Sequence, residues 1–254
     1  MIIIKHGRDL EGMRLSCALA ANVRDRVAEK IAPGVTTLEL ADYAAELIAA
    51  ANGKSAFYGY RGFPGQICTS VNEEVVHGIP SGRRIELGDI VSIDVGVILD
   101  GYFGDTARTV MVGVTDPDVL RLVRVTERAL EQVLEWAVEG RRLSDVSHGI
   151  QKTAEGAGFS VVRDFVGHGV HRIFHAAPQI PHYGERGKGK KLRPGMVFTI
   201  EPMINLGSYE AEILVDGWTA ITVDRQLSAQ FEHTVAVTRD GVDVLTLSPA
   251  KVLA

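Results

Sequence analysis

The chain has 254 residues, with 27 basic and 32 acidic side chains and a formal net charge of −5. Hydrophobic residues make up 46% and charged residues 23%, which is typical of a globular protein. The acidic balance argues against a nucleic-acid-binding protein, and no apolar run approaches the roughly 18–20 residues that span a bilayer. Two cysteines, Cys17 and Cys68, exclude a disulfide framework and a thiolate zinc module. We therefore expect a cytoplasmic protein that folds as one domain over residues 1–254.

The amino-terminal part of the chain predicts two helices and a loop. Apolar residues recur at helical spacing over about residues 9–32, and Pro33 ends the run. The segment Thr36-Thr37-Leu38-Glu39 fits a capping box that begins a second helix, which continues to a cap at Gly53. The stretch 55–65 is rich in glycine and aromatic residues, and we expect it to form a shaped loop.

Strands are expected over residues 67–112, followed by two helices and a second group of strands. Asp116-Pro117 supplies the N-cap and first position of a helix that runs to about Glu139, and Ser144 caps a shorter helix. The further strands are predicted at residues 160–166, 196–205, 211–215, 218–223 and 231–238. This order predicts an α+β fold in which helices cover one face of a curved, mostly antiparallel sheet.

The most informative segment is a predicted hairpin that carries two acids. Asp100-Gly101, flanked by apolar runs, is a strong hairpin signal. With these residues in the turn, Asp94 lies opposite Ala107 and Asp105 lies opposite Gly96, which leaves the space beside Asp105 empty. Because side chains alternate between faces, both carboxylates share one face about 7–8 Å apart and can reach one site. The alternative is an exposed face on which the two acids are solvated.

Three other segments bring similar chemistry. Glu201 lies in the apolar strand 195–204, Glu232 interrupts a second strand at 230–237, and His168 lies between two glycines. Each signal is weak alone, because a single such residue is more often a hydrogen-bonded part of the structure. Four carboxylates and an imidazole in apolar strands are nevertheless hard to explain without cations.

Charge counting favours a dinuclear metal site. Four carboxylates bring about −4, which two divalent ions neutralise. Oxygen and imidazole ligands without thiolate suit Mn, Fe or Co better than a structural zinc, although zinc remains an option. Paired ions about 3.5–4 Å apart can activate a water, so the pattern predicts a hydrolase.

At these residues the sequence resembles the type I methionine aminopeptidases, which are pita-bread metallopeptidases, without an amino-terminal extension. The resemblance covers nearly the whole chain and rests on specific motifs: residues 71–80, the Asp94/Asp105 hairpin, Gly167-His168-Gly169, His175, residues 199–202 and residues 228–234. It implies the pita-bread fold, with two halves related by a pseudo-two-fold axis. It also implies five metal ligands: Asp94, Asp105, His168, Glu201 and Glu232.

The resemblance further implies three catalytic residues. His175 would contact the scissile peptide, and His77 would help to position it and support the tetrahedral intermediate. Glu201 would act as general base and proton shuttle. The alternative for His77 is a loop histidine that is satisfied by the backbone.

A substrate pocket is implied by the same resemblance. A methionine side chain needs a closed apolar slot with aromatic and sulfur-bearing walls. Besides His77 and His175, the matching positions are Tyr60, Phe63, Cys68, Phe174 and Trp218. An aromatic cluster is usually core, but Tyr60 and Phe63 lie in a Gly-rich loop and Trp218 follows a glycine, which favours a pocket lining. Phe57 stands where some relatives have a small residue, so it bears on the depth of the pocket.

The implied function is co-translational removal of the amino-terminal methionine from nascent polypeptides whose second residue is small, by a water activated at two metal ions. We expect a monomer that contacts the ribosome transiently and needs neither nucleic acid nor a membrane. One alternative is an Xaa-Pro aminopeptidase or prolidase, which shares the five ligand types. A second is a non-catalytic pita-bread binding protein. Val76, His171 and Ala176 depart from the common bacterial pattern without removing a ligand, and could shift metal preference.

Overall fold

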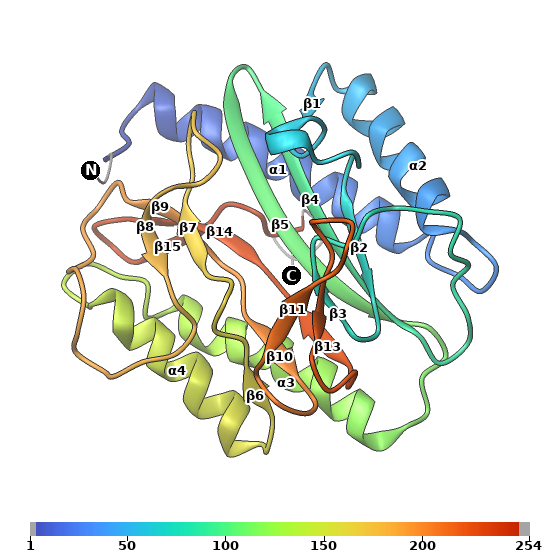
Figure 1. The fold of residues 1–254 in the computed structure, drawn as a ribbon. Helices are drawn as coiled ribbons and strands as arrows, with labels where there is room; N and C mark the ends of the chain where they lie inside the picture. Colours follow the sequence, from blue (N-terminus) through green and yellow to red (C-terminus); the bar gives the residue numbers. More distant parts are fainter. Residues whose placement is uncertain (1–3, 249–254) are drawn as a thin grey trace.

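The structure is a computed structural model that describes residues 4–248, and its chain forms two halves of similar make-up (Figure 1). The predicted domain span extends beyond these residues at both ends. The first half contains α1 (Arg8–Ala28), α2 (Thr37–Ala50), β1 (Lys54–Ser55), the 3-10 turn η1 (Tyr60–Gly62), β2 (Cys68–Val71), β3 (Glu74–Val76), β4 (Ile90–Leu99) and β5 (Tyr102–Met111). The second half contains α3 (Pro117–Leu134), α4 (Leu143–Gly156), β6 (Ser160–Val161), β7 (Gly167–Gly169), β8 (Ala176–Ile180), β9 (Val197–Ile200), β10 (Met203–Asn205), β11 (Ala211–Ile213), β12 (Ala220–Thr222), β13 (Ser228–Gln230), β14 (His233–Val237) and β15 (Val242–Val244).

Two of the predicted helix starts are confirmed. The Thr36 hydroxyl accepts a hydrogen bond from the Glu39 N–H, and the Glu39 carboxylate accepts one from the Thr36 N–H, so the capping box is complete. Asp116 caps α3, with Pro117 at the first helical position. The third start is wrong: Ser144 lies inside the first turn of α4, where its hydroxyl bonds the backbone of Lys188 instead.

The predicted ends of the first and third helices lie too far along the chain. α1 ends at Ala28, because the N–H groups of Lys30 and Ile31 bond carbonyls three residues back and tighten the chain out of the α-helix. α3 ends at Leu134, ahead of the predicted position. After α2, Asn52 takes the left-handed conformation (φ 57°) expected of Gly53.

The β4–β5 hairpin has the predicted register. Asp94 pairs with Ala107 and Gly96 pairs with Asp105. Asp100 and Gly101 form the turn with φ of 51° and 78°, the positive values that a two-residue hairpin turn of this kind requires. The face of β4 opposite Asp94 contributes buried valine and isoleucine side chains to a core covered by α1 and α2. Packing therefore holds the acid-bearing face away from the helices.

In the second half the strand pattern is more broken than predicted. The main sheet has the order β15-β14-β9-β7-β8, and a separate small sheet contains β13, β10 and β6. Pro202 interrupts the predicted strand 196–205 between β9 and β10, since proline lacks the N–H that a central strand needs. Strands β7, β8, β13 and β15 were not predicted, and β7 is short and glycine-rich.

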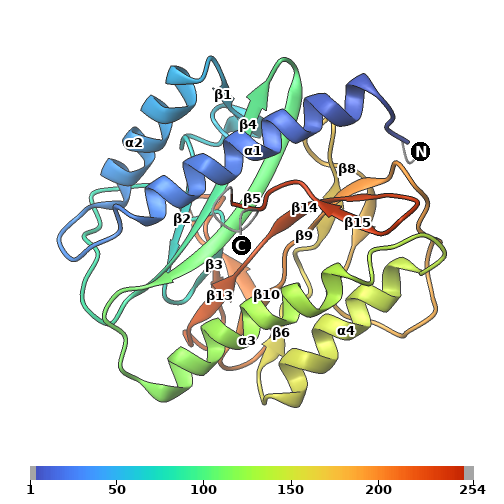
Figure 2. The same ribbon diagram turned by 180° about the vertical axis from the view of Figure 1, so that it is seen from behind.

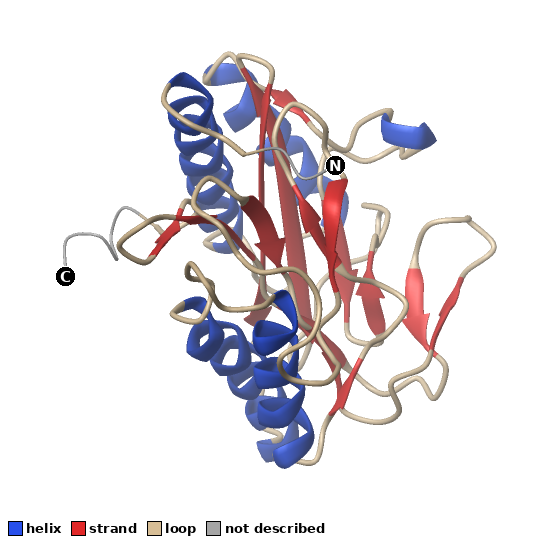
Figure 3. Ribbon diagram, turned by 90° about the vertical axis from the view of Figure 1, so that its left-hand side faces the viewer, coloured by secondary structure: helices blue, strands red, loops and turns tan. Residues whose placement is uncertain are grey.

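Helices cover one face of these sheets, as predicted, and all strand pairs in the described part of the chain are antiparallel. Figure 3 shows the four helices on one side of the strands. From behind, α1 and α2 cover one half and α3 and α4 cover the other (Figure 2). Among the residues described, no helix has the length and apolar character needed to cross a membrane.

The two halves meet along β5 and the segment that leads into β14. The Glu232 N–H donates to the Ala107 carbonyl over 2.9 Å, and the Thr234 hydroxyl donates to the Asp105 carbonyl over 2.7 Å. These bonds place Glu232 of the second half beside Asp105 of the first. The acid-bearing hairpin therefore lies at the centre of the molecule.

Candidate active site

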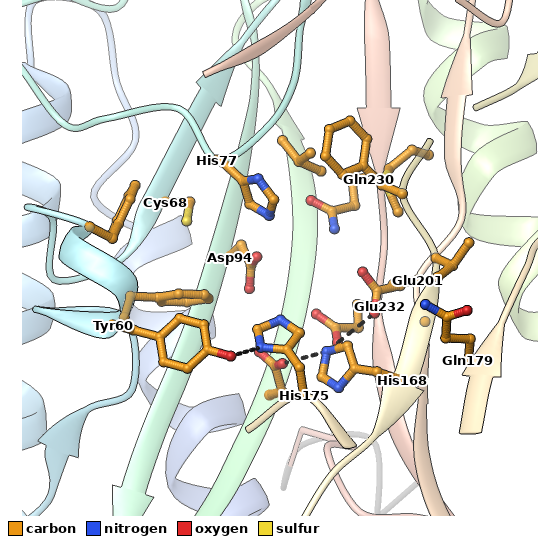
Figure 4. A pocket seen from close by; sticks show the side chains of 18 of the residues that line it. Tyr60, Cys68, His77, Asp94, His168, His175, Gln179, Glu201, Gln230 and Glu232 are labelled. Atoms are coloured by element: carbon orange, nitrogen blue, oxygen red, sulfur yellow. Dashed lines mark hydrogen bonds and ion pairs between the residues drawn. The ribbon is translucent and has the colours of Figure 1, made fainter. Parts of the chain in front are cut away.

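One cavity of about 590 Å³ lies where the two halves meet. Its walls come from the loop after β1, strands β2 to β5, the segment around β7, and the turns beside β9 and β14 (Figure 4). The cavity contains eleven of the twelve predicted site residues: Tyr60, Phe63, Cys68, His77, Asp94, Asp105, His168, His175, Glu201, Trp218 and Glu232. Side chains that are far apart in the sequence therefore share one hollow.

Four of the predicted metal ligands lie close together. One ligand atom from each of Asp105, His168 and Glu232 lies within 4.8 Å of the others, and all three side chains are buried. His168 Nε2 is 3.5 Å from Asp105 Oδ2 and 3.6 Å from Glu201 Oε1. Asp94 is not part of the group of three but lines the same cavity.

Several carboxylate oxygens in this cluster have no hydrogen-bond donor. Asp94 Oδ1, Asp105 Oδ1 and Glu232 Oε1 are buried and have no partner among the described residues. Buried polar atoms are almost always hydrogen-bonded or bound to an ion, because desolvating them otherwise is costly. Three orphaned oxygens beside one imidazole therefore fit a cation, and this donor set suits divalent ions such as Mn, Fe and Co.

The pKa values of the carboxylates in this cluster also favour a bound cation. Desolvation, followed by repulsion from the neighbouring carboxylates, raises the pKa of Asp94 and Glu232 well above the usual value. Desolvation also raises the pKa of Glu201 to about 7, although His168 and a hydrogen bond from Thr199 act against it. The protein alone thus disfavours the negative charges that it brings together, and bound cations would reverse this.

Two residues outside the predicted set hold Glu201 and His168 in place. The Thr199 hydroxyl accepts a hydrogen bond from the His168 N–H over 2.9 Å and donates to Glu201 Oε1 over 2.6 Å. His182 is fully buried, and its Nε2 accepts a hydrogen bond from the Glu201 N–H over 3.1 Å. Alternation along the strand signals Thr199, two residues before Glu201 on the same face. Nothing in the sequence pattern signals His182.

The glycines around His168 allow neighbouring strands to approach closely. A Cβ on Gly167 would lie 2.5 Å from the Thr199 carbonyl oxygen, and a Cβ on Gly169 would lie 2.2 Å from the Ala177 carbonyl oxygen. Both glycines therefore allow β9 and β8 to approach the backbone of β7. They thereby position the strand that carries His168.

The space beside Gly96 is filled, which corrects the expectation of a void next to Asp105. A Cβ on Gly96 would lie 3.0 Å from Phe174 Cζ and 3.1 Å from Phe57 Cε2. Phe174 is predicted from the sequence to line the pocket. In the structure its side chain is 2% exposed and is not among the residues that line the cavity. Its ring packs behind Phe57 and Tyr60, with ring centroids 5.2 Å away in both cases. It supports the pocket wall from behind.

The apolar part of the cavity is built from aromatic rings and one thiol. The rings of Phe63 and Trp218 meet edge to face with centroids 5.1 Å apart, and Phe57 contacts Phe63 at 6.0 Å. Cys68 pairs with Asp94 in the β2–β4 register, which places the thiol beside the acidic cluster. Burial raises the pKa of this thiol well above its usual value, so it serves as an apolar wall.

Two histidines other than His168 face the cavity. His77 has a left-handed backbone (φ 60°), and its ring meets the edges of Phe165 and Trp218. Burial lowers the pKa of His77 to about 4. Desolvation by the pocket walls, followed by the charge of His168, lowers the pKa of His175 to about 3. Both rings are therefore neutral near pH 7.

Of the three residues that depart from the common bacterial pattern, Val76, His171 and Ala176, two line the cavity. Val76 and Ala176 line it, so the cavity wall carries an isopropyl group and a methyl group at these positions. His171 does not line the cavity; it is 8% exposed, and its Nε2 has no hydrogen-bond partner among the described residues.

The chain is similar to known proteins over most of its length. Residues 11–239 match the model of "Metallopeptidase family M24". The chain is 56% identical to methionine aminopeptidase A of Synechocystis over 94% of its own length and 95% of that protein. It superposes on the crystal structure of methionine aminopeptidase from Rickettsia prowazekii with a TM-score of 0.95 and 46% identity, covering 97% of this chain and 100% of that one.

A more distant structural likeness concerns the fold alone. The prolidase from Pyrococcus furiosus superposes with a TM-score of 0.77 at 23% identity, and the match covers 97% of this chain and 66% of that chain. Together these structures confirm the predicted pita-bread fold, with mixed helices and antiparallel sheets.

Proposed function

Because this chain belongs to metallopeptidase family M24, we propose that it removes the amino-terminal methionine from polypeptides whose second residue is small. The observation that carries this proposal is the placement of an acidic, imidazole-bearing cluster and a group of aromatic side chains in one cavity. The near full-length similarity to methionine aminopeptidases supports it over other peptidases of the family.

Two divalent ions are proposed to be held by Asp94, Asp105, His168, Glu201 and Glu232. Ions of this kind supply a water nucleophile at neutral pH and polarise the scissile carbonyl. The number two rests on charge: four carboxylates and a neutral imidazole bring about −4, which one divalent ion would leave half-compensated. Manganese, iron and cobalt suit the ligands best, and zinc is the fourth candidate.

The remaining side chains orient the substrate and move protons. Glu201 Oε1 is engaged by Thr199, so Oε2 is the oxygen available to take a proton from the attacking water. His175 and His77, both neutral, would bond the scissile peptide and support the tetrahedral intermediate. Phe63, Cys68 and Trp218, with Phe57 at the wall, would enclose the methionine side chain.

We further propose that the substrate is the amino terminus of a nascent chain, met in the cytoplasm during a transient contact with the ribosome. The acidic net charge of −5 gives no reason to expect dependence on nucleic acid. We also propose that the protein is a monomer with one catalytic domain over residues 1–254.

An assay on two peptides separates this function from that of a prolidase. The purified protein is treated with a chelator, and Mn, Fe, Co or Zn is added back before incubation with Met-Ala-Ser or Gly-Pro. We expect metal-dependent release of methionine from Met-Ala-Ser and little cleavage of Gly-Pro. Preferential cleavage of Gly-Pro would support the prolidase alternative. Absence of cleavage with every metal would overturn the proposed peptidase activity and favour a non-catalytic binding protein.

A further inference from the structure

We propose that Tyr60 is a positioning residue that fixes the tautomer of His175, so that His175 presents an Nε2–H donor to the cavity. His168, directly beside it, would have the opposite tautomer when its Nε2 holds a cation. Two adjacent imidazoles would thus be assigned different tasks by the atom that each Nδ1 meets. The inference deepens the proposed function and rests on it for its catalytic consequence, but the tautomers themselves can be measured independently.

The partner of His168 fixes its tautomer by elimination. His168 Nδ1 lies 3.2 Å from the carbonyl oxygen of Gly169, which can only accept a hydrogen bond. When Nε2 holds a cation, Nδ1 therefore carries the proton of the ring and Nε2 supplies its lone pair. That nitrogen is the one that lies beside Asp105 and Glu201, as a metal ligand requires.

The partner of His175 is a phenol instead of a carbonyl. His175 Nδ1 lies 2.9 Å from Tyr60 Oη, and the dashed line in Figure 4 marks this contact. A phenol is a stronger donor than a neutral imidazole N–H, and an imidazole lone pair is a stronger acceptor than a phenol oxygen. The favoured arrangement therefore has Tyr60 donating to Nδ1, which leaves the proton of the neutral ring on Nε2.

The loop around Tyr60 is built to hold this hydroxyl in place. Gly59, Arg61 and Gly62 all have positive φ, of 77°, 49° and 89°. The loop is closed by the Gly59 N–H, which donates to the Phe63 carbonyl over 2.8 Å. Three residues with positive φ within four positions, closed by this bond, fix the path of the loop, so the ring that projects from it is preorganised.

Ring packing fixes the remaining freedom of the tyrosine. Its ring stacks on His175 with centroids 5.2 Å apart and meets Phe174 edge to face, also at 5.2 Å. Phe174 also contacts His175 at 4.5 Å, so all three rings are locked together. Tyr60 can therefore hold the His175 ring without itself touching the reacting atoms.

The different roles of His168 and His175 have a functional reason. The centroids of His168 and His175 are only 4.2 Å apart, so a free lone pair on His175 Nε2 would offer a second imidazole ligand beside the first. A proton on that nitrogen prevents coordination. It also supplies a donor for the oxygen of the scissile peptide, where negative charge develops during attack.

The proposal is tested with Tyr60→Phe, which removes only the hydroxyl. Tyr58→Phe is the matched control, because Tyr58 lies in the same loop and is 63% exposed. Nitrogen-15 NMR of histidine-labelled, metal-free protein reports which ring nitrogen carries the proton. We expect the Nε2–H form for His175 in the wild type and in Tyr58→Phe, and a mixed population of the two His175 tautomers in Tyr60→Phe.

Kinetics on Met-Ala-Ser provide the second readout. We expect Tyr60→Phe to lower kcat by about 10- to 100-fold, the usual range for a group that orients a functional histidine, with KM little changed. Tyr58→Phe should match the wild type. A wild-type spectrum with His175 in the Nδ1–H form would overturn the proposal, even if the variant failed to fold. Full activity of a folded Tyr60→Phe would also overturn it, while leaving the aminopeptidase function intact.

Discussion

Replacement of Glu201 by Gln should stabilise the metal-free protein by an amount that increases with pH. The buried carboxyl of Glu201 has its pKa raised to about 7, against 4.5 for an ordinary glutamate, because it is desolvated beside other acids. Gln has the same shape, and its amide oxygen can still accept the hydrogen bond from Thr199. The substitution therefore removes the titration while keeping the packing.

The sign and the size of the expected change in unfolding free energy follow from the linkage between protonation and folding. A carboxyl whose pKa is higher in the folded state binds its proton more tightly there, so stability is lost as pH rises from 4.5 to about 7. A shift of this size corresponds to about 3 kcal/mol at roughly 1.4 kcal/mol per pKa unit. His77, His175 and His182 also titrate differently on folding, but they are present in both proteins and cancel in the difference.

The assay is urea unfolding of both proteins in the presence of a chelator, at several pH values between 4 and 8. The difference in unfolding free energy should change by about 3 kcal/mol in favour of Glu201→Gln across this range and then level off. Saturating Mn(II) should reverse the order, because only the wild type keeps the full ligand set. A difference that does not vary with pH would show that Glu201 is not held in a desolvated acidic cluster.

Three further substitutions test the construction of the site. Gly169→Ala should lower the free energy of unfolding by about 2 kcal/mol and weaken metal binding in calorimetry, because the new Cβ would lie 2.2 Å from the Ala177 carbonyl oxygen. Gly156→Ala is the control, since a Cβ there would meet open space. Equal stability of the two variants would refute the steric argument. Phe174→Ala should cost about 3–5 kcal/mol in urea unfolding, since the ring is 2% exposed; a loss below 1 kcal/mol would contradict its supporting role. Asp94→Asn should reduce the number of ions bound per chain, measured by elemental analysis, and an unchanged number would exclude Asp94 as a ligand.

Local signals predicted the hairpin and two helix starts well. The register that brings Asp94 and Asp105 to one face follows from a two-residue turn, and that turn depends only on Asp100-Gly101 and the flanking apolar runs. The Thr36 cap is likewise complete within four residues of chain. Such features need no knowledge of the rest of the molecule.

Features that depend on contacts between distant segments were not predicted. The space beside Gly96 is filled by Phe174 and Phe57, which come from different parts of the chain. Ser144 bonds the backbone of Lys188, so tertiary contact overrides its local preference for capping. His182 lies in the connection between β8 and β9, and its ring accepts a hydrogen bond from the backbone N–H of Glu201. Sequence patterns carry no record of these pairings.

The central claim is that five side chains hold a pair of divalent ions in the cavity between the two halves. Anomalous X-ray diffraction from crystals soaked in Mn(II), with data collected on both sides of the manganese edge, tests it most directly. Two anomalous peaks about 3.5–4 Å apart among Asp94, Asp105, His168, Glu201 and Glu232 are predicted. A single fully occupied peak would contradict the dinuclear site, and peaks only outside this cavity would contradict the account as a whole.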